Sequence, residues 1–242
     1  MTLTGKTAIV TGASSGIGEA TARRLVEGGC NVVLAARRED RLERLVEELG
    51  EKAIPVPTDV TDAADCASLV ARTIEHFGGL DILVNNAGLG FYGSIAEGNP
   101  EDWRTMFDVN VLGVLYVTRA AVRHMLENGS GDIVFISSIA GRRVPTPEAT
   151  VYAATKHAVN AIAEGLRMDL TDKGIRSVTV EPGLVRTEFP EGPDSSAEEF
   201  YASKDYTPLK AEDIAGAVLY ALEQPDRVSV NEILVRSTEQ TR

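Results

Sequence analysis

The chain has 242 residues, of which 43% are hydrophobic and 25% charged, and its formal net charge at pH 7 is −12. This length and composition are typical of one globular α/β domain with a substantial core, and they exclude a largely disordered protein. The negative charge argues against a nucleic-acid partner, because phosphates require a basic surface.

Cysteine and histidine usage point to a reducing compartment and away from metal chemistry. Cys30 and Cys66 form no Cys-x-x-Cys pair and no disulfide framework, and the three histidines have no partners at ligand spacing. We therefore expect no metal site. The first residues run straight into an expected strand, and no apolar run has membrane-spanning length. We expect neither a signal peptide nor a membrane partner, and hence a cytoplasmic protein.

The first glycine-rich stretch joins an expected strand, 8–10, to an expected helix, 17–27. This order places free backbone N–H groups and the positive end of a helix dipole where a pyrophosphate can bind. Gly12 permits the sharp exit from the strand, Gly16 lets the backbone approach phosphate, and Gly18 lets the helix pack closely on the sheet. An ordinary loop is the alternative, but the strand before and the helix after favour a nucleotide site.

Strand-like and helix-like segments alternate along the whole chain, which predicts a doubly wound, Rossmann-like parallel sheet of about seven strands with helices on both faces. No repeat or linker is evident, so we expect a single domain spanning residues 1–242. The further expected strands are 31–35, 53–57, 82–84, 131–136, 175–180 and 232–235, and the further expected helices are 39–49, 61–77, 99–127, 151–172 and 211–222.

The second expected strand ends at Ala36 and is followed by Arg37 and Arg38. At this point of a dinucleotide-binding fold, a carboxylate bonds the 2′-hydroxyl of NAD, whereas arginine accommodates the 2′-phosphate of NADP. Two arginines therefore favour NADP(H) as the cofactor. Of the two, Arg37 is the favoured phosphate ligand, and its removal is expected to weaken NADP binding about ten- to a hundredfold. The alternative is that both arginines only begin the solvated helix 39–49.

The glycine turn has the spacing Gly-x3-Gly-x-Gly after Thr11, and it resembles the cofactor turn of the short-chain dehydrogenase/reductase family. The end of the chain lacks the glycine pair that often follows the last strand in this family, and it looks like the NADP-dependent serine and 3-hydroxy acid dehydrogenase branch. Further motifs in the expected order extend the resemblance to nearly the whole chain, namely Asn85-Asn86-Ala87-Gly88, Asn110, Ser138, Tyr152-x3-Lys156 and Pro182-Gly183-x3-Thr187.

The resemblance implies hydride transfer between a nicotinamide and a carbonyl or alcohol carbon, with Tyr152 as the acid/base. A phenol with a pKa of about 10 is a poor base near neutrality, but an adjacent ammonium favours its ionised form. Lys156 lies one helical turn from Tyr152 and can share its site. The resemblance further implies that Ser138 hydrogen-bonds the reacting oxygen and that Asn110 disturbs its helix and connects Lys156 to solvent through water.

For the cofactor, the resemblance implies that Asp59 bonds the adenine amino group and that Thr187 bonds the nicotinamide carboxamide. The alternative for Asp59 is a helix cap or a turn residue. The full set of expected cofactor ligands is Gly12, Ser14, Ser15, Gly16, Ile17, Gly18, Arg37, Arg38, Asp59, Val60, Asn86, Ala87, Gly88, Tyr152, Lys156, Pro182, Gly183 and Thr187.

The substrate stays open at this stage. Residues 188–210 break the regular pattern and are expected to form a substrate lid. A small 3-hydroxy acid such as serine would need a cation, for which Arg142, Arg143 and Arg186 are candidates. Broad aldehyde/ketone reduction is the alternative, and a non-catalytic NADP-binding regulatory protein or an oligomeric scaffold would belong to other classes. The resemblance also implies a homotetramer with helices 100–127 and 151–172 at an interface.

Overall fold

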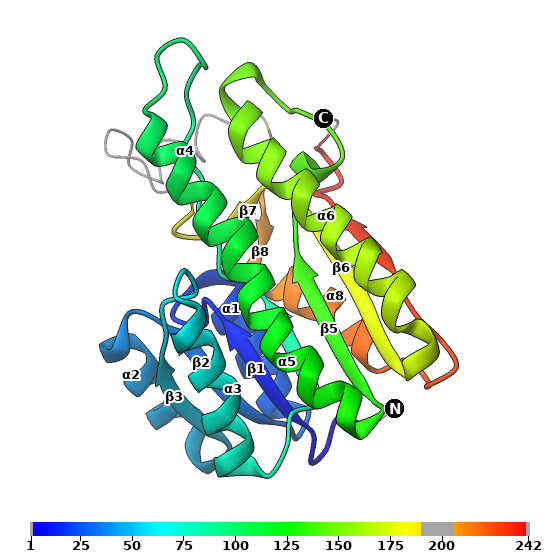
Figure 1. Ribbon diagram of the computed structural model, residues 1–242. Helices are drawn as coiled ribbons and strands as arrows, with labels where there is room; N and C mark the ends of the chain where they lie inside the picture. Colours follow the sequence, from blue (N-terminus) through cyan, green and yellow to red (C-terminus); the bar gives the residue numbers. More distant parts are fainter. Residues whose placement is uncertain (1, 190–205, 241–242) are drawn as a thin grey trace.

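Figure 1 shows the computed structural model of the chain, which describes residues 2–189 and 206–240. Parallel strands form one seven-stranded sheet in the order β3-β2-β1-β4-β5-β6-β9, beside a small parallel pair, β7 and β8. The strands are β1 (Thr7–Thr11), β2 (Asn31–Ala36), β3 (Ala53–Pro57), β4 (Ile82–Asn85), β5 (Gly131–Ile136), β6 (Ile175–Pro182), β7 (Val185–Arg186), β8 (Leu209–Lys210) and β9 (Glu232–Val235).

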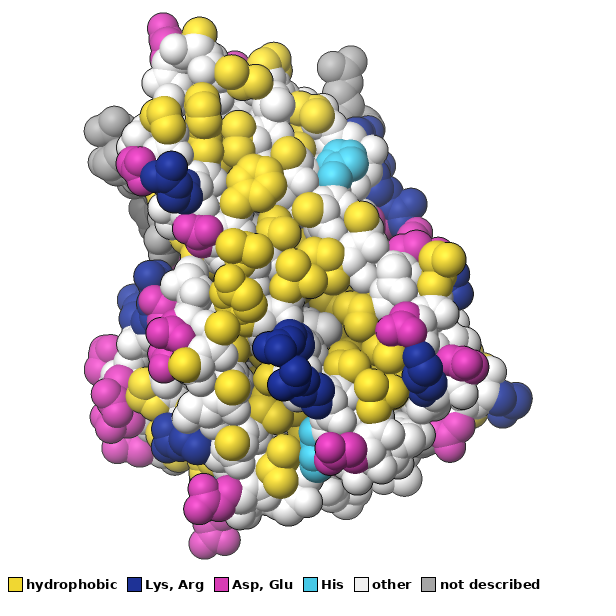
Figure 2. All heavy atoms as spheres, viewed as in Figure 1, with side chains coloured by type: hydrophobic (Ala, Val, Ile, Leu, Met, Phe, Trp, Pro, Cys, Tyr) yellow, Lys and Arg dark blue, Asp and Glu magenta, His cyan; other side chains and the backbone are white. Residues whose placement is uncertain are grey.

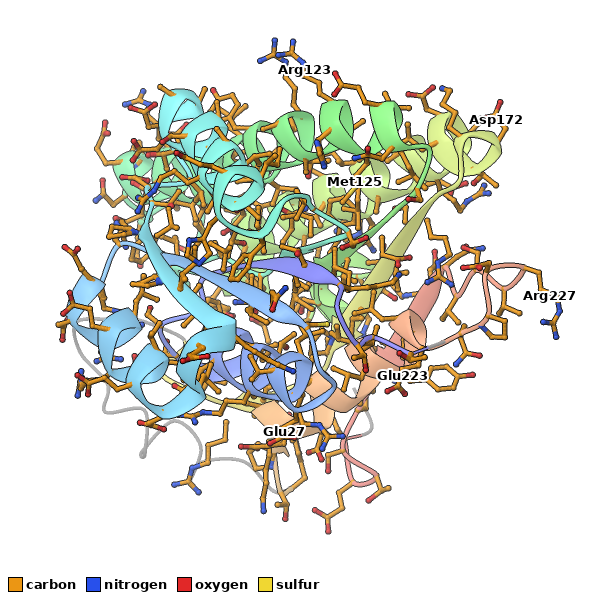
Figure 3. The ribbon with its side chains drawn as sticks, turned by 90° about the horizontal axis from the view of Figure 1, so that it is seen from below. Glu27, Arg123, Met125, Asp172, Glu223 and Arg227 are labelled. Carbon is orange, nitrogen blue, oxygen red and sulfur yellow. The ribbon has the colours of Figure 1, made fainter. Side chains whose placement is uncertain are left out.

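Helices cover both faces of the sheet. Seen from below in Figure 3, Glu27 and Glu223 lie on the face covered by α1 and α8, whereas Arg123 and Asp172 lie on the face covered by α5 and α6. The helices are α1 (Gly16–Glu27), α2 (Glu39–Leu49), α3 (Ala63–Phe77), α4 (Pro100–Phe107), α5 (Val114–Asn128), α6 (Thr150–Leu170) and α8 (Ala211–Leu222). The expected fold class, a doubly wound parallel α/β sheet, is confirmed.

Two hydrophobic cores lie on opposite faces of the sheet, because successive residues of a strand point to opposite faces. In β1, Ile9 packs into the core beneath α3, α5 and α6, and Val10 packs into the core beneath α1, α2 and α8. Both side chains are fully buried. Burial on both faces explains why the strands read as nearly continuous apolar runs in the sequence.

The strand order reverses at β1, which pairs with β2 on one side and with β4 on the other. The connections from β1 and β4 therefore leave the sheet in opposite directions, and a crevice opens beyond the carboxyl ends of these two strands. Ligands of open α/β sheets bind at this kind of switch point. The glycine-rich turn follows β1, so the fold brings the predicted nucleotide motif to this crevice.

The expected helix 99–127 is divided into α4 and α5 by a π-helical turn, Asp108–Gly113. Asn99 caps α4 by accepting a hydrogen bond from the backbone N–H of Glu101 at 3.1 Å. Within the span Pro100–Asn128, an 18-residue window has a mean hydropathy of 1.2, so this span is long and apolar enough to cross a membrane. The expectation that no apolar run reaches membrane-spanning length is therefore wrong. Met125 packs against the sheet in Figure 3, but only 39% of the most apolar window is buried, so the span also has an exposed apolar face.

The remaining expected elements agree closely with the structure. Helices α2 and α8 and strands β3, β5 and β9 have the expected bounds, and the other elements differ by a few residues at their ends. Of the expected lid, 188–210, residues 190–205 lie outside the described part of the chain. Its last two residues form β8, which pairs with β7.

Candidate active site

The glycine turn and the segment after β4 are tied together by one threonine and one asparagine. The Thr11 hydroxyl accepts hydrogen bonds from the backbone N–H groups of Asn86 and Ala87, both at 3.0 Å. The Asn86 amide donates to the carbonyl oxygens of Thr11 at 2.9 Å and Gly12 at 3.3 Å. These bonds satisfy backbone groups where β1 and β4 diverge, so both loops are held at the edge of the crevice.

The glycines of the turn are required by close backbone contacts. A Cβ on Gly18 would collide with the Gly12 carbonyl oxygen and would lie 2.5 Å from the Asn86 amide nitrogen. Gly16 has a φ of +56°, and a Cβ there would lie 3.1 Å from the Thr187 methyl group. The predicted tight packing of helix on turn is therefore present, and Thr187 borders the same turn.

The start of α1 fits an anionic group. Its N-cap residue, Ser15, makes no side-chain capping bond, so the first backbone N–H groups of this twelve-residue helix are left to another partner. A cleft of about 640 Å³ opens here between α1, α2 and the end of β7. Its lining includes Ser14, Ser15, Gly16, Arg41, Arg186, Thr187 and Glu188. A dinucleotide pyrophosphate suits this helix end, because the backbone N–H groups at the start of α1 and the hydroxyls of Ser14 and Ser15 border the cleft.

Arg38 reaches across this cleft, whereas Arg37 does not. The Arg38 guanidinium donates to the Ser15 hydroxyl at 2.7 Å, to the Ser14 hydroxyl at 3.0 Å and to the Glu188 carboxylate at 2.9 Å. Arg37 is exposed, and its charge is one of the influences that lower the pKa of Asp59. Of the two predicted arginines, Arg38 is the one joined to the glycine turn.

Asp59 has a local partner in this structure. Its Oδ1 accepts hydrogen bonds from the Thr61 backbone N–H at 2.9 Å and from the Thr61 hydroxyl at 2.8 Å, and these bonds are the main reason that its pKa is lowered. The turn alternative is therefore realised, while the helix cap of α3 is Asp62. The neighbouring Val60 packs against Gly113 of the π turn. A Cβ on Gly113 would lie 2.9 Å from a methyl group of Val60.

Tyr152, Lys156 and Ser138 meet beyond the carboxyl end of β5. Tyr152 is 8% exposed and Lys156 6%. Burial raises the pKa of the Tyr152 phenol, the nearby Tyr92 raises it further, and the hydrogen bond with Ser138 lowers it. The Lys156 ammonium donates to the Ile136 carbonyl oxygen at 3.0 Å and lies 5.8 Å from the centre of the Tyr152 ring. Burial lowers the pKa of Lys156 to about 8.

Asn110 joins this group from the π turn. Its amide oxygen accepts from the Leu89 backbone N–H at 2.9 Å, and its amide nitrogen donates to the Leu89 carbonyl at 2.8 Å and to the Thr155 hydroxyl at 3.0 Å. A Cβ on Gly88 would lie 3.3 Å from the Asn110 amide oxygen and 3.6 Å from the Lys156 nitrogen. Glycine at this position keeps the approach to both side chains open.

Aromatic side chains surround Tyr152. Its ring centre lies 5.7 Å from that of Phe189 and 5.8 Å from that of Tyr92. A Cβ on Gly90 would lie 2.6 Å from the edge of Phe189 and 3.1 Å from the Tyr152 ring. We call this group the apolar cluster, and its further members are Met106, Ala140, Ala153, Leu89, Phe91, Trp103 and Val151. The wall of the site beside the phenol is therefore mainly hydrocarbon.

Arg142, a candidate ligand for an acidic substrate, is held by carboxylates of the protein. Its guanidinium donates to the buried Glu181 at 2.5 Å and also bonds Glu232. Asn160 donates to the other oxygen of Glu181 at 2.7 Å. Arg186 lines the cleft at the glycine turn. Within the described residues, no group of three His, Cys, Asp or Glu side chains could hold a metal ion.

Two residues outside the expected ligand set border the site, namely Glu188, which follows β7, and Gln240, which follows β9. Gln240 is buried, and its side-chain oxygen accepts from the Leu184 backbone N–H at 3.1 Å and fills the space that a Cβ on Gly183 would need. Pro182 ends β6 just before this turn. Neither Gln240 nor Glu188 belongs to a recognisable motif, so only their spatial neighbours reveal them.

Most of the predicted site residues are thus gathered along one crevice. Ile17 packs on the core at the start of α1, and Ala87 follows the strand β4 beside the glycine turn. This site combines a helix N-terminus that follows a glycine turn with a phenol, a hydroxyl and an amine at the same edge of the sheet. Such a combination is typical of dinucleotide-binding oxidoreductases.

Comparison with known proteins places the chain within this class. The family description "short chain dehydrogenase" matches residues 6–196. An uncharacterised oxidoreductase of Staphylococcus aureus strain MRSA252 is 43% identical over 235 residues, covering 97% of this chain and 98% of the relative. The chain belongs to the short-chain dehydrogenase family, and this confirms the resemblance inferred from the sequence.

Solved structures of the family agree with this chain over almost its whole length. A serine dehydrogenase complexed with NADP+, in its closed form, has a TM-score of 0.92 and 36% identity, covering 98% of this chain and 96% of that one. A 3-ketoacyl-(acyl-carrier-protein) reductase from Brucella melitensis, complexed with NADH, has a TM-score of 0.87 and 32% identity, with coverage of 98% of both chains. Similar structures thus carry either nicotinamide dinucleotide.

Proposed function

We propose that this oxidoreductase uses NADP(H) and transfers a hydride between the nicotinamide and a carbonyl or secondary alcohol carbon, with Tyr152 as the acid/base. The observation that carries this proposal is the grouping of the Tyr152 phenol, its hydrogen-bond partner Ser138 and the Lys156 ammonium at the edge of the dinucleotide crevice. The cofactor supplies the hydride chemistry when bound, and the protein orients and polarises the substrate.

In the reductive direction, Tyr152 donates its proton to the oxygen of the substrate carbonyl. Ser138 hydrogen-bonds the same oxygen and stabilises charge that grows only toward the transition state. Lys156 stabilises the phenolate that remains, because its ammonium lies beside the ring in a site from which water is largely excluded. Asn110 serves as a positioning residue that holds the backbone of Leu89 next to this group.

The preference for NADP(H) rests on Arg38. Its guanidinium already lies against the hydroxyls of Ser14 and Ser15 at the start of α1, a set of donors suited to a phosphate. The similar serine dehydrogenase binds NADP+. We expect Arg38→Ala to weaken NADPH binding by about ten- to a hundredfold. Arg37→Ala is expected to have the smaller effect of the two, because Arg37 is exposed and the hydrogen bonds to the glycine turn are made by Arg38.

For the substrate, the geometry favours an uncharged aldehyde or ketone with apolar substituents. The apolar cluster supplies the wall beside Tyr152, and burial of hydrocarbon against it contributes about 25 cal/mol per Å². Arg142 is bound to Glu181 and Glu232, so recruiting it for a substrate carboxylate would compete with its bond to the buried Glu181 carboxylate. A small 3-hydroxy acid such as serine is the second candidate, and the similarity to a serine dehydrogenase favours it.

One assay distinguishes these functions. The protein is mixed with NADPH and a panel of aromatic and aliphatic aldehydes and ketones, and with NADP+ and serine or 3-hydroxypropionate-type acids, while the absorbance of the reduced cofactor is followed. Higher kcat/KM for the uncharged carbonyls supports the primary proposal, and higher values for the acids support the second. Absence of turnover with every compound, alongside intact NADPH binding, would favour a non-catalytic NADP-binding protein.

We also propose a homotetramer. In Figure 2 hydrophobic side chains gather along α4, α5 and the neighbouring α6, and the exposed members on these helices include Phe107, Leu112, Leu115 and Met168. An apolar face of this kind usually marks a protein interface. Light scattering after size exclusion would measure the mass of the particle. Leu115→Glu should reduce that mass, whereas Tyr220→Glu on α8 should leave it unchanged.

We propose that cofactor and substrate bind to one domain spanning residues 1–242. Residues 188–210 would form the substrate lid, and the enzyme would be cytoplasmic. Limited proteolysis tests the domain organisation: one protected fragment of nearly full length is expected. Two stable fragments of similar size would indicate two domains instead.

A further inference from the structure

Two arginines of the cofactor cleft hold the carboxylate of Glu188. Arg38 donates to it at 2.9 Å, and Arg41, in the first turn of α2, donates to both of its oxygens at 2.6 and 2.8 Å. Glu188 lies about 150 residues away from them in the sequence. The same Arg38 guanidinium bonds the hydroxyls of Ser14 and Ser15. The carboxylate of Glu188 is thus bonded to two guanidinium groups, and one of these, that of Arg38, is also bonded to two hydroxyls.

This set of donors is the one that a phosphate monoester would use. Guanidinium groups bind carboxylates and phosphates with the same planar, paired geometry, so either anion can satisfy them. The two arginines lower the pKa of Glu188, which therefore carries its charge at neutral pH. A dianionic phosphate and the Glu188 carboxylate cannot both take the same N–H groups, and they repel each other at close range.

We infer that Glu188 is a cofactor-selectivity residue, whose carboxylate occupies the arginine site of the cofactor 2′-phosphate and must be displaced when that phosphate binds. The inference rests on the proposed use of NADP(H) by this cleft. It assigns to Glu188 an effect opposite to that of Arg38: the arginine draws the phosphate in, and the carboxylate reduces its apparent affinity.

The position of Glu188 in the chain gives the displacement a second consequence. Glu188 stands between Thr187, which borders the glycine turn, and Phe189, which packs against Tyr152. Phe189 donates its backbone N–H to the Thr187 hydroxyl at 3.1 Å, so these three residues form one compact turn. Release of Glu188 from the arginines therefore acts on the same short turn that packs against the phenol.

The same cleft offers a matched control. Glu48 also lines it and also pairs with an arginine, Arg23, at 2.7 Å. Glu48→Gln and Glu188→Gln remove the same charge from the same cleft and keep nearly the same side-chain volume. Only Glu188 contacts Arg38 and Arg41, so a general effect of net charge would appear in both variants, whereas competition at the arginines would appear in one.

The test is calorimetric titration of the full-length protein with adenosine 2′,5′-bisphosphate, which carries the 2′-phosphate, and with 5′-AMP, which lacks it. We expect Glu188→Gln to bind the bisphosphate about three- to tenfold more tightly than the unaltered protein, as loss of a half-exposed competing ion pair allows. Its affinity for 5′-AMP, and both affinities of Glu48→Gln, should change less than about twofold.

Unchanged or weaker bisphosphate binding by Glu188→Gln would overturn the inference, since a weaker complex would mean that Glu188 clamps the cofactor. Equal gains for both nucleotides would also overturn it. The cofactor preference is tested separately by the unaltered protein: if it binds 5′-AMP as tightly as the bisphosphate, the proposed use of NADP(H) fails. A selective gain in Glu188→Gln would support the competition even then.

Discussion

The Asn110 amide donates a 3.0 Å hydrogen bond to the hydroxyl of Thr155, and Thr155 in turn donates to the carbonyl oxygen of Tyr152 at 2.7 Å. This pair joins the π turn between α4 and α5 to the helix that carries the phenol and the amine of the site. Asn110 also hydrogen-bonds the backbone N–H and C=O groups of Leu89. One side chain therefore holds the π turn, the segment after β4 and helix α6 in fixed positions relative to one another.

Replacing Asn110 by leucine should therefore destabilise the fold. The substitution leaves the N–H and C=O groups of Leu89 without partners in a partly buried place, which costs up to about 1–3 kcal/mol for each group. We expect a loss of about 2–4 kcal/mol in the free energy of unfolding, measured by urea denaturation. Asn128→Leu, at the exposed end of α5, is the control and should change it by less than about 0.5 kcal/mol. Equal effects of both variants would contradict the positioning role.

Tyr152→Phe should separate chemistry from binding. The ring and its contacts with Phe189 are kept, but the proton of the phenol is lost, so turnover is expected to fall by about a hundred- to ten-thousandfold. NADPH affinity should change little, and stopped-flow absorbance together with calorimetric titration measures both quantities. Tyr220→Phe, an exposed tyrosine on α8, should keep full activity. Turnover retained in Tyr152→Phe would refute the acid/base assignment.

Lys156 should couple stability to pH in a defined direction. Its pKa is lowered to about 8 in the folded chain from an ordinary value of 10.5, so the unfolded state binds more protons between these two values. The cost of burying the charged amine is complete below pH 8 and is relieved as the pH rises toward about 10.5. Lys156→Met, which removes that cost, should stabilise the fold at neutral pH by about 1–3 kcal/mol and by clearly less near pH 10. Thermal unfolding at both pH values measures the difference, and a gain that is independent of pH would contradict the prediction.

The same pKa predicts how the reductive rate depends on pH. Lys156 loses its charge above about pH 8, and with it the stabilisation of the developing phenolate. We expect kcat/KM for carbonyl reduction to decline as the pH rises through this value. A profile that stays level between about pH 6 and about pH 10 would show that the charge of Lys156 does not assist the step.

Gly18→Ala should damage the nucleotide turn, because a Cβ at this position has no free space. The added carbon would collide with the Gly12 carbonyl and approach the Asn86 amide to 2.5 Å, and neither backbone nor this bonded amide can move cheaply. We expect a loss of more than about 3 kcal/mol in stability or failure to bind NADPH. Gly165→Ala, in α6 with open space around it, is the control and should stabilise the fold by about 0.5–1 kcal/mol. Denaturation and cofactor titration of both variants provide the comparison.

Much of the architecture follows from local sequence. The bounds of α2 and β3 agree with the prediction, because helix periodicity, short apolar runs and turn residues act over a few neighbouring positions. The glycine turn and the Tyr152/Lys156 pair were predictable for the same reason, since each motif depends on spacing within one strand–turn–helix unit or one helix.

Tertiary structure decided which charges meet. Two ion pairs join residues far apart in the chain, Arg38 with Glu188 and Arg142 with Glu181. A packing contact does the same, since the Gln240 side chain fills the space beside Gly183. No local pattern encodes such contacts, because they depend on how the helices and the last strands dock on the sheet. The sequence alone thus determined the fold class and predicted a set of candidate reactive side chains. The packing determined which arginines are available to a ligand, because a guanidinium already bonded to a buried carboxylate is costly to recruit.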